Sequence, residues 1–200
     1  MLKIKEILIG TNNKGKYREI CNLLPKKVKK YSQKKFKISS PKEIGKSFAK
    51  NSLIKASYFS KKTNLICLSD DSGLEVDLLK GQPGIYSSRW SGYKNDFDLA
   101  IKRVFEEMKK IKKDWKNDNS ARFVCCMTLF WPDGKSYSVN GTIKGKISHI
   151  MKGSNGFGYD PIFIPNGFNQ TFGEMQPKLK MSIGRPLSAN LNDSQFFIKY

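Results

Sequence analysis

The chain has 200 residues, which is enough for one large domain or for two lobes around a cleft. It contains no run of about eighteen apolar residues and no signal peptide, so a soluble cytoplasmic protein is expected. The four cysteines form no CxxC pair and lie mostly in apolar segments, which argues against a zinc site or a disulfide framework.

The net charge of +20 favours polyanionic partners, namely nucleic acid, nucleotides or an acidic membrane surface. The lysines are spread along the chain, however, and many fall on expected turns and helix ends. This distribution is typical of a solvated surface, and it would also help to collect a triphosphate.

The first third of the chain alternates strands and helices. We expect a strand over residues 4–10, a helix over 14–24 that ends before Pro25, and a short strand over 36–38. Ser47 is a suitable N-cap for a helix to about Ser60, and the apolar run before Asp70 predicts a strand over 65–69. This order predicts an α/β sheet.

The remainder is organised around a long hairpin. Asp96 or Asn95 would cap an amphipathic helix that runs to about Lys112, and a polar linker follows over 112–119. Strands over 121–131 and 135–147 are joined by Pro132-Asp133-Gly134, a strong turn signal, and resemble the spine of a second lobe. A further strand is expected over 162–164. The expected buried stripe of the helix is Leu99, Ile101, Val104, Phe105, Met108 and Ile111.

The most informative motif is the pair Asp70-Asp71, which follows the apolar run at its expected end and precedes Gly73, where a sharp turn is expected. Adjacent carboxylates repel each other unless a cation or a proton intervenes, and Mg²⁺ is the usual solution. The alternative is a strand-to-turn junction in which both side chains are only solvated.

Two loops add to this signal. The segment Thr11 to Lys16 lies between the first strand and the first helix, where free N–H groups and the helix dipole favour phosphate. In the glycine-rich loop 153–161, Phe157 and Tyr159 could stack on a base, and Asp160 could bind a base edge or orient a neighbour. Taken alone, each loop could also be an ordinary turn. The single histidine, His149, is interpreted as structural.

Taken together, these segments resemble the inosine triphosphate pyrophosphatase family, which hydrolyses non-standard purine nucleoside triphosphates. The resemblance covers roughly residues 4–183, in the family's order and approximate spacing. The blocks that carry it are Thr11-Asn12-Asn13-Lys14-Gly15-Lys16, residues 51–56, Ser69-Asp70-Asp71-Ser72-Gly73-Leu74-Glu75-Val76, residues 83–89, Gly156-Phe157-Gly158-Tyr159-Asp160-Pro161-Ile162-Phe163 and residues 171–175.

The resemblance implies an elongated α/β fold with a mixed sheet, flanking helices and two lobes around a nucleotide-binding cleft, over residues 1–200. It implies Mg²⁺-dependent cleavage to a monophosphate and pyrophosphate, and a homodimer without specific nucleic-acid binding. Asp71 and Asp70 match the catalytic and metal positions, and Arg89 matches a residue of the cleft or of the dimer contact. The implied substrate contacts are Thr11, Asn12, Asn13, Lys14, Gly15, Lys16, Lys55, Ser72, Phe157, Gly158, Tyr159, Asp160, Lys180 and Arg185.

The chain departs from the family pattern at two places. Many relatives carry a glutamate ligand for Mg²⁺ where this chain has Lys50, and Glu43 and Glu75 are possible substitutes. The family's base-gripping His-Arg pair falls on Arg185 and Pro186, within an atypical tail over 184–200. These departures predict weaker Mg²⁺ binding and relaxed base selectivity.

Two other functions stay open at the sequence level. A catalytically weakened nucleotide-binding relative would explain Lys50 and the altered tail. A basic nucleic-acid-binding protein would use the charge, although the sequence shows no familiar RNA- or DNA-reading motif.

Overall fold

The computed structural model describes residues 4–92 and 96–183, which form an α/β fold. Its helices are α1 (Lys14–Leu23), α2 (Phe48–Thr63) and α3 (Phe97–Ile111). Short 3₁₀ turns cover Gln33–Phe36, Asp77–Leu79, Gly84–Arg89, Trp115–Asn117 and Asp160–Ile162. The strands are β1 (Glu6–Ile9), β2 (Lys29–Ser32), β3 (Cys67–Val76), β4 (Ser120–Phe130), β5 (Ser136–Ile147) and β6 (Phe163–Pro165).

The strands form one mixed sheet in the order β2-β1-β3-β4-β5-β6. β1 pairs in parallel with both β2 and β3, whereas β5 and β6 are antiparallel. Helices connect the parallel strands, as such crossovers require. The expected mixed sheet with flanking helices is therefore confirmed.

The described chain divides into two compact units. The first comprises residues 4–71 and 125–141, and the second comprises residues 72–92, 96–124 and 142–183. Strands β3, β4 and β5 each contribute residues to both units.

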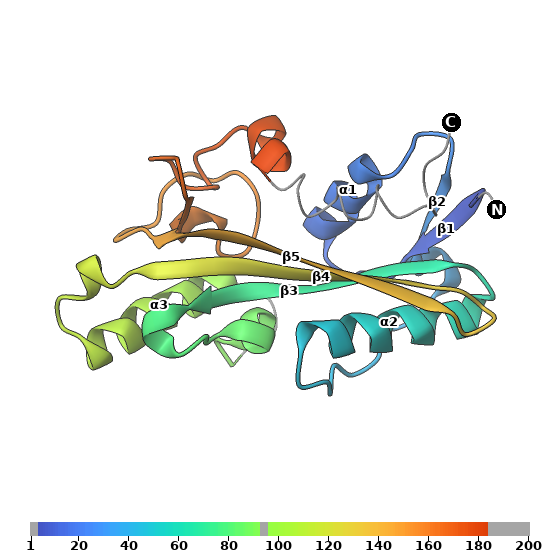
Figure 1. Ribbon diagram of the computed structural model, residues 1–200, viewed down its shortest axis with the longest axis horizontal. Coiled ribbons are helices and arrows are strands. Elements are labelled where there is room, and N and C mark those ends of the chain that lie inside the picture. The colour runs from blue at the N-terminus through green and yellow to red at the C-terminus, as the bar shows by residue number, and fades with distance from the viewer. Residues whose placement is uncertain (1–3, 93–95, 184–200) are drawn as a thin grey trace. The chain divides into compact units, whose positions relative to one another are not determined.

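In the first unit, α1 and α2 cover opposite faces of the strands (Figure 1). Ile7 and Ile9 of β1 pack in one apolar cluster with Ile20 of α1, whereas Leu8 packs in another with Phe59 of α2. Because side chains alternate along a strand, consecutive residues reach different helices. This alternation also decides where the acidic pair of β3 points.

Helix α2 begins at the expected N-cap and ends at Thr63, beyond the expected end at about Ser60. Ser47 accepts a hydrogen bond from the N–H of Lys50, which confirms the expected N-cap. Asn64 closes the helix in the left-handed conformation, with φ of 55°, which asparagine tolerates well. Asn51 and Lys55, one turn apart, lie on its buried face.

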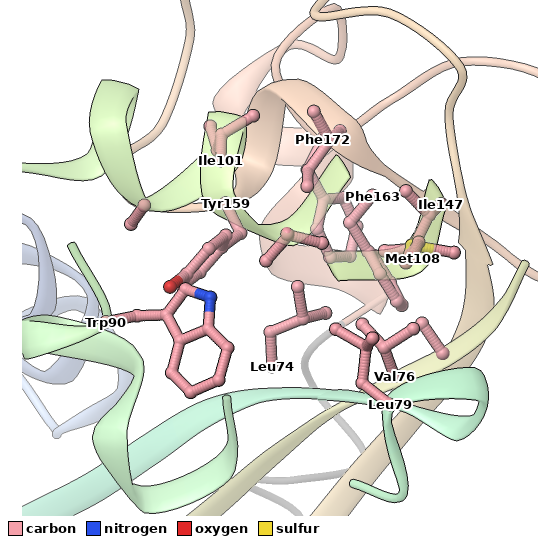
Figure 2. Packing of buried hydrophobic residues seen from close by; sticks show 14 of the residues in the cluster. Leu74, Val76, Leu79, Trp90, Ile101, Met108, Ile147, Tyr159, Phe163 and Phe172 are labelled. Carbon is pink, nitrogen blue, oxygen red and sulfur yellow. The ribbon is translucent and has the colours of Figure 1, made fainter. Parts of the chain in front are cut away.

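The second unit has its own apolar core, to which α3 contributes Ile101 and Met108 (Figure 2). Val104 of the same helix also belongs to this core. Two residues of the expected stripe lie outside it, since Leu99 is 42% exposed and Ile111 is 58% exposed. Leu99 lies in the opening turn of α3, where Phe97 packs against the core instead, and Ile111 is the last residue of the helix.

Two expected strands were placed wrongly. Residues 36–38 are not a strand, and the second strand is β2, in the lysine-rich segment just before. β2 is an edge strand, and an edge tolerates charged residues that hide the apolar pattern. The third strand does not end at residue 69, because β3 continues through Asp70, Asp71 and Gly73 to Val76, without a turn.

Candidate active site

The acidic pair lies in the middle of β3 and is buried, with Asp70 only 3% exposed and Asp71 only 6% exposed. The expected position at the end of a strand is therefore wrong. As neighbours on a strand, the two carboxylates project to opposite faces of the sheet. The nearest ion-pair partner of each carboxylate lies on a different helix, although Lys16 also acts on Asp71 through its charge.

Asp70 is paired with α1. Its Oδ2 lies 2.8 Å from Nζ of Lys16, whose side chain is largely buried. Burial alone would lower the pKa of Lys16, but the attraction of Asp70 and its hydrogen bond outweigh burial and raise that pKa. Lys16 is therefore a fixed cation, although its partner is a carboxylate of the chain.

Asp71 is paired with α2. Asn51 Nδ2 donates to Asp71 Oδ2 at 3.1 Å, and Lys55 Nζ lies 3.4 Å from Asp71 Oδ1. Lys55 Nζ also lies 2.7 Å from Oε1 of Glu43, in the loop before α2. Two carboxylates from distant segments thus share one buried ammonium group.

Burial raises the pKa of Asp71 above its ordinary value, and Glu43 adds to this effect. Lys55, Lys16 and the hydrogen bond from Asn51 act in the opposite direction without cancelling it. A carboxylate with a raised pKa is a stronger base, as the acceptance of a proton from water requires.

The loop before α1 is organised by Asn13. Its Oδ1 accepts from the N–H groups of Gly15 and Lys16, at 2.8 and 3.0 Å, so these donors are already used within the chain. The expectation that they are free for phosphate is therefore wrong for this conformation. A cavity of about 450 Å³ adjoins the loop and carries no acidic side chain; its lining residues are Thr11, Asn12, Asn13, Lys14, Tyr17, Arg18, Ser32 and Lys34.

The glycine-rich loop of the second unit is held by Asp160, which is 2% exposed. Its Oδ2 accepts from the N–H of Phe157 at 2.7 Å and lies 2.6 Å from Nζ of Lys180. Gly156 has a φ of 80°, and a Cβ there would lie 1.9 Å from Asp160 Oδ2. Of the two roles considered for Asp160, the structure supports that of orienting its neighbours.

The two aromatic residues of this loop differ in exposure. Tyr159 is buried in the core, packs edge-on against Phe97 and donates its hydroxyl to the carbonyl of Ser87 (Figure 2). Its ring therefore anchors the loop in the core, and a contact between Tyr159 and substrate stays a prediction. Phe157 is half-buried, and Nζ of Lys180 lies 4.4 Å from its ring centroid, so Phe157 remains the candidate for stacking.

The other residues singled out from the sequence have varied surroundings. Ser72 is half-buried and directly follows Asp71, and Gly158 has a positive φ of 67°. Arg89 lies against the ring of Tyr86, with 5.2 Å from guanidinium to centroid. His149 packs edge-on against Trp115, as a structural residue would. Arg185 and the tail over 184–200 lie outside the described residues.

The sequence motifs do not single out two residues of this site. Asn51 is only one residue of the block 51–56, and Glu43 is only one of two possible substitutes for a glutamate at the position of Lys50. The spacing of four residues between Asn51 and Lys55 on a buried helix face was the available signal. Glu75, the other possible substitute, instead forms an ion pair with Arg122, with 2.7 Å between Oε2 and Nε. Lys50 is exposed.

The chain is similar in sequence to curated proteins that share one name. A curated protein of Rhodospirillum centenum named dITP/XTP pyrophosphatase is 41% identical over 184 residues, which cover 92% of this chain and 90% of that protein. One of the same name from Bartonella quintana is 39% identical over 181 residues, covering 88% of this chain and 84% of that protein.

Solved structures of similar proteins have the same fold. A HAM1 protein from Coxiella burnetii is 31% identical with a TM-score of 0.82, covering 94% of this chain and 99% of that chain. A dITP/XTP pyrophosphatase from Mycobacterium abscessus is 35% identical with a TM-score of 0.75, covering 95% and 99%. Because the Ham1 family model also matches residues 7–189, this chain belongs to the Ham1 family.

Proposed function

We propose that this protein hydrolyses non-standard purine nucleoside triphosphates (ITP, dITP and XTP) to the monophosphate and pyrophosphate, and so removes them from the nucleotide pool. The observation that carries the proposal is the buried cluster of Asp71, Glu43 and Lys55, with Asp70 and Lys16 on the other face of β3. Curated relatives that match this chain over most of their length are named dITP/XTP pyrophosphatase.

In this proposal Asp71 accepts a proton from the water that attacks the innermost phosphorus, because its carboxylate is held in place by Asn51 and Lys55. Lys16 and Lys55 are the cations that would hold the phosphate oxygens, because each lies beside an acidic residue of the site. Ser72 adds a hydroxyl next to the base. The chain's own contribution is thus charge compensation and positioning.

The residues present fit Mg²⁺ in one particular way. Among the described residues no group of three or more His, Cys, Asp and Glu side chains could hold a metal. Mg²⁺, however, is commonly bound by one or two carboxylates together with substrate phosphates and water. Asp71 and Glu43, which share the ammonium of Lys55, are the carboxylates that would hold it. When bound, it would neutralise phosphate charge and make water more acidic.

Asp70 was expected as a second ligand of the same ion. Its side chain projects to the other face of β3 and pairs with Lys16, so we propose instead that Asp70 fixes Lys16 for the phosphates. Glu43, in contrast, takes over the place expected for a glutamate at position 50. We propose that Lys50 does not weaken Mg²⁺ binding, because its side chain is exposed.

The loop of Phe157 to Asp160 is proposed to receive the purine. Phe157 offers a partly exposed ring, and Lys180 and Asp160 fix the loop on which it lies. Glycines at 156 and 158 adopt positive φ values that other residues avoid, so the backbone stays close to any bound base. Because Arg185 lies outside the described residues, its part in base selection stays a prediction.

The direct test is product analysis with ITP and Mg²⁺ in H₂¹⁸O. Attack at the innermost phosphorus gives equimolar monophosphate and pyrophosphate, with the label in the monophosphate. Asp71→Asn should retain the fold and lose roughly 10²–10⁴-fold in kcat. Formation of diphosphate and orthophosphate by the wild type would contradict the proposal.

The same assay judges the catalytically weakened alternative, which predicts nucleotide binding without turnover. A nucleic-acid-binding protein would show DNA or RNA affinity that falls steeply with salt. We further propose a homodimer in the cytoplasm. Within the described residues, no helix is long and apolar enough to cross a membrane.

A further inference from the structure

Asn51 is fully buried on α2, and its side-chain amide is used at both ends. Its Nδ2 donates to Asp71 Oδ2 at 3.1 Å, while its Oδ1 accepts from the N–H of Gly45 at 2.8 Å. The amide therefore joins strand β3 to the loop that precedes α2.

This loop matters because it carries Glu43, two residues before Gly45. Lys55 makes the parallel connection one helical turn further on, from Asp71 Oδ1 to Glu43 Oε1. Each oxygen of Asp71 is thus held by one side chain of α2, and each of these side chains also holds the loop. One connection is charged and the other is neutral.

The neutral connection, through Asn51, leaves no space for a side chain at residue 45. A Cβ at Gly45 would lie 2.6 Å from Asn51 Oδ1 and 2.9 Å from Lys50 Cβ. The loop backbone can approach the amide only because residue 45 is glycine. Since an unpaired buried amide is costly, this geometry is strongly favoured once formed.

The two connections also differ in what a substrate would do to them. An ammonium group is attracted to phosphate, so Lys55 is expected to turn from the carboxylates toward an incoming triphosphate. A neutral amide whose donor and acceptor are both used has no such competitor. Asn51 would then be the connection that still fixes Asp71 relative to Glu43 during reaction.

We propose that Asn51 is a positioning residue that holds the proposed base, Asp71, and the loop of Glu43 in one fixed arrangement while Lys55 serves the substrate. This inference rests on the proposed function, because it assigns Asn51 a role in that reaction. It places no contact between Asn51 and the substrate.

The test compares Asn51→Leu, which keeps the volume but loses both hydrogen bonds, with Asn51→Asp, which keeps the acceptor for Gly45 but loses the donor to Asp71. Ser52→Ala is the matched control, since Ser52 is the next residue of α2, is also buried, and has its hydroxyl within hydrogen-bond distance of Thr128 and Cys126 rather than of Asp71. The readouts are kcat and KM for ITP with Mg²⁺, and amide hydrogen exchange at Gly45 in the metal-free protein labelled with ¹⁵N-glycine.

We expect kcat to fall roughly 10–100-fold in both Asn51 variants, with KM changed less than threefold, because misplacement of a reacting group affects the chemical step most. Gly45 should exchange faster in Asn51→Leu and stay protected in Asn51→Asp. Ser52→Ala should keep both kcat and Gly45 protection.

The proposal is overturned if either Asn51 variant retains kcat within threefold of Ser52→Ala, or if Gly45 stays protected in Asn51→Leu. Should Asn51→Leu fail to fold, Asn51→Asp decides through kcat alone. Should the wild type cleave no triphosphate, the proposed function fails, and rapid exchange of Gly45 in the wild type would separately show that the connection itself does not form.

Discussion

Replacement of Lys55 by methionine is the most direct probe of the carboxylate cluster. Lys55 is 8% exposed, and its ammonium lies 2.7 Å from Glu43 and 3.4 Å from Asp71. Methionine keeps most of the side-chain volume and removes the charge. Two carboxylates would then face the same buried space without a cation.

Removal of one partner from a buried ion pair costs about 3–5 kcal/mol, because the remaining charge is left uncompensated. The Glu43 side chain is 23% exposed and can turn toward water, so we expect the lower end, about 3 kcal/mol, at neutral pH. For a chain of this size the melting temperature should fall by about 6–12 °C. Lys50→Met, on the exposed side of the same helix, is the control and should change stability by less than about 0.5 kcal/mol.

The pH dependence distinguishes charge repulsion from a packing defect. The pKa of Asp71 is already raised by burial, and the loss of Lys55 raises it further, so the folded variant binds more protons than the unfolded chain. A carboxyl whose pKa is higher in the folded state costs stability above that pKa, and this cost disappears as pH falls through it. The difference in the free energy of unfolding between the variant and the wild type should therefore be smaller at pH 4.5 than at pH 7.

Urea denaturation in the presence of EDTA, at both pH values, measures this difference in stability. Mg²⁺ should also reduce it at pH 7, because a divalent ion can replace the missing cation between the carboxylates. An equal loss of stability at both pH values, together with no effect of Mg²⁺, would show that Asp71 and Glu43 do not repel each other and that the cluster is wrongly described.

Three further predictions use the same set of assays. Lys16→Met should raise KM for ITP about 10-fold or more, because it removes a fixed cation; an unchanged KM would exclude Lys16 from phosphate binding. Gly156→Ala should raise KM for ITP and lower stability by about 1–3 kcal/mol, because its φ is 80° and the new Cβ would meet Asp160; a wild-type melting temperature would refute this. Lys50→Glu should leave the Mg²⁺ concentration for half-maximal rate within twofold, whereas Glu43→Gln should raise it, as a titration of Mg²⁺ would show.

The regular elements were predictable where the local pattern agrees with the tertiary surroundings. The helix beginning after Ser47 was placed correctly because its N-cap lies next to its apolar face. The end of β3 was not, because two consecutive aspartates resemble a surface turn unless their partners are known. Lys16 is separated from Asp70 by a helix and a strand, and no local window contains both.

The site was predictable as a set of motifs but not as a set of contacts. Sequence placed Tyr159 and Phe157 side by side as equivalent aromatic candidates, whereas the backbone of the loop directs Tyr159 into the core and leaves Phe157 half-buried. Asp160 likewise accepts a hydrogen bond from the N–H of Phe157 and forms an ion pair with Lys180. Such a division of roles follows from φ values and packing, which residue identity alone does not fix.

The charge balance of the cluster bears on how a triphosphate would bind. The ammonium group of Lys55 stands against the two carboxylates of Asp71 and Glu43, whereas Lys16 balances Asp70 on the other face of β3. The metal-free cluster of Asp71, Glu43 and Lys55 therefore has a net charge of about −1 despite the chain's +20. Such a cluster repels a free triphosphate at short range even while the basic surface attracts it from afar. One divalent cation reverses the local sign. The rate should therefore follow the concentration of the magnesium–nucleotide complex, with excess free ITP a weak competitor, and the carboxylates rather than the surface lysines should set this requirement.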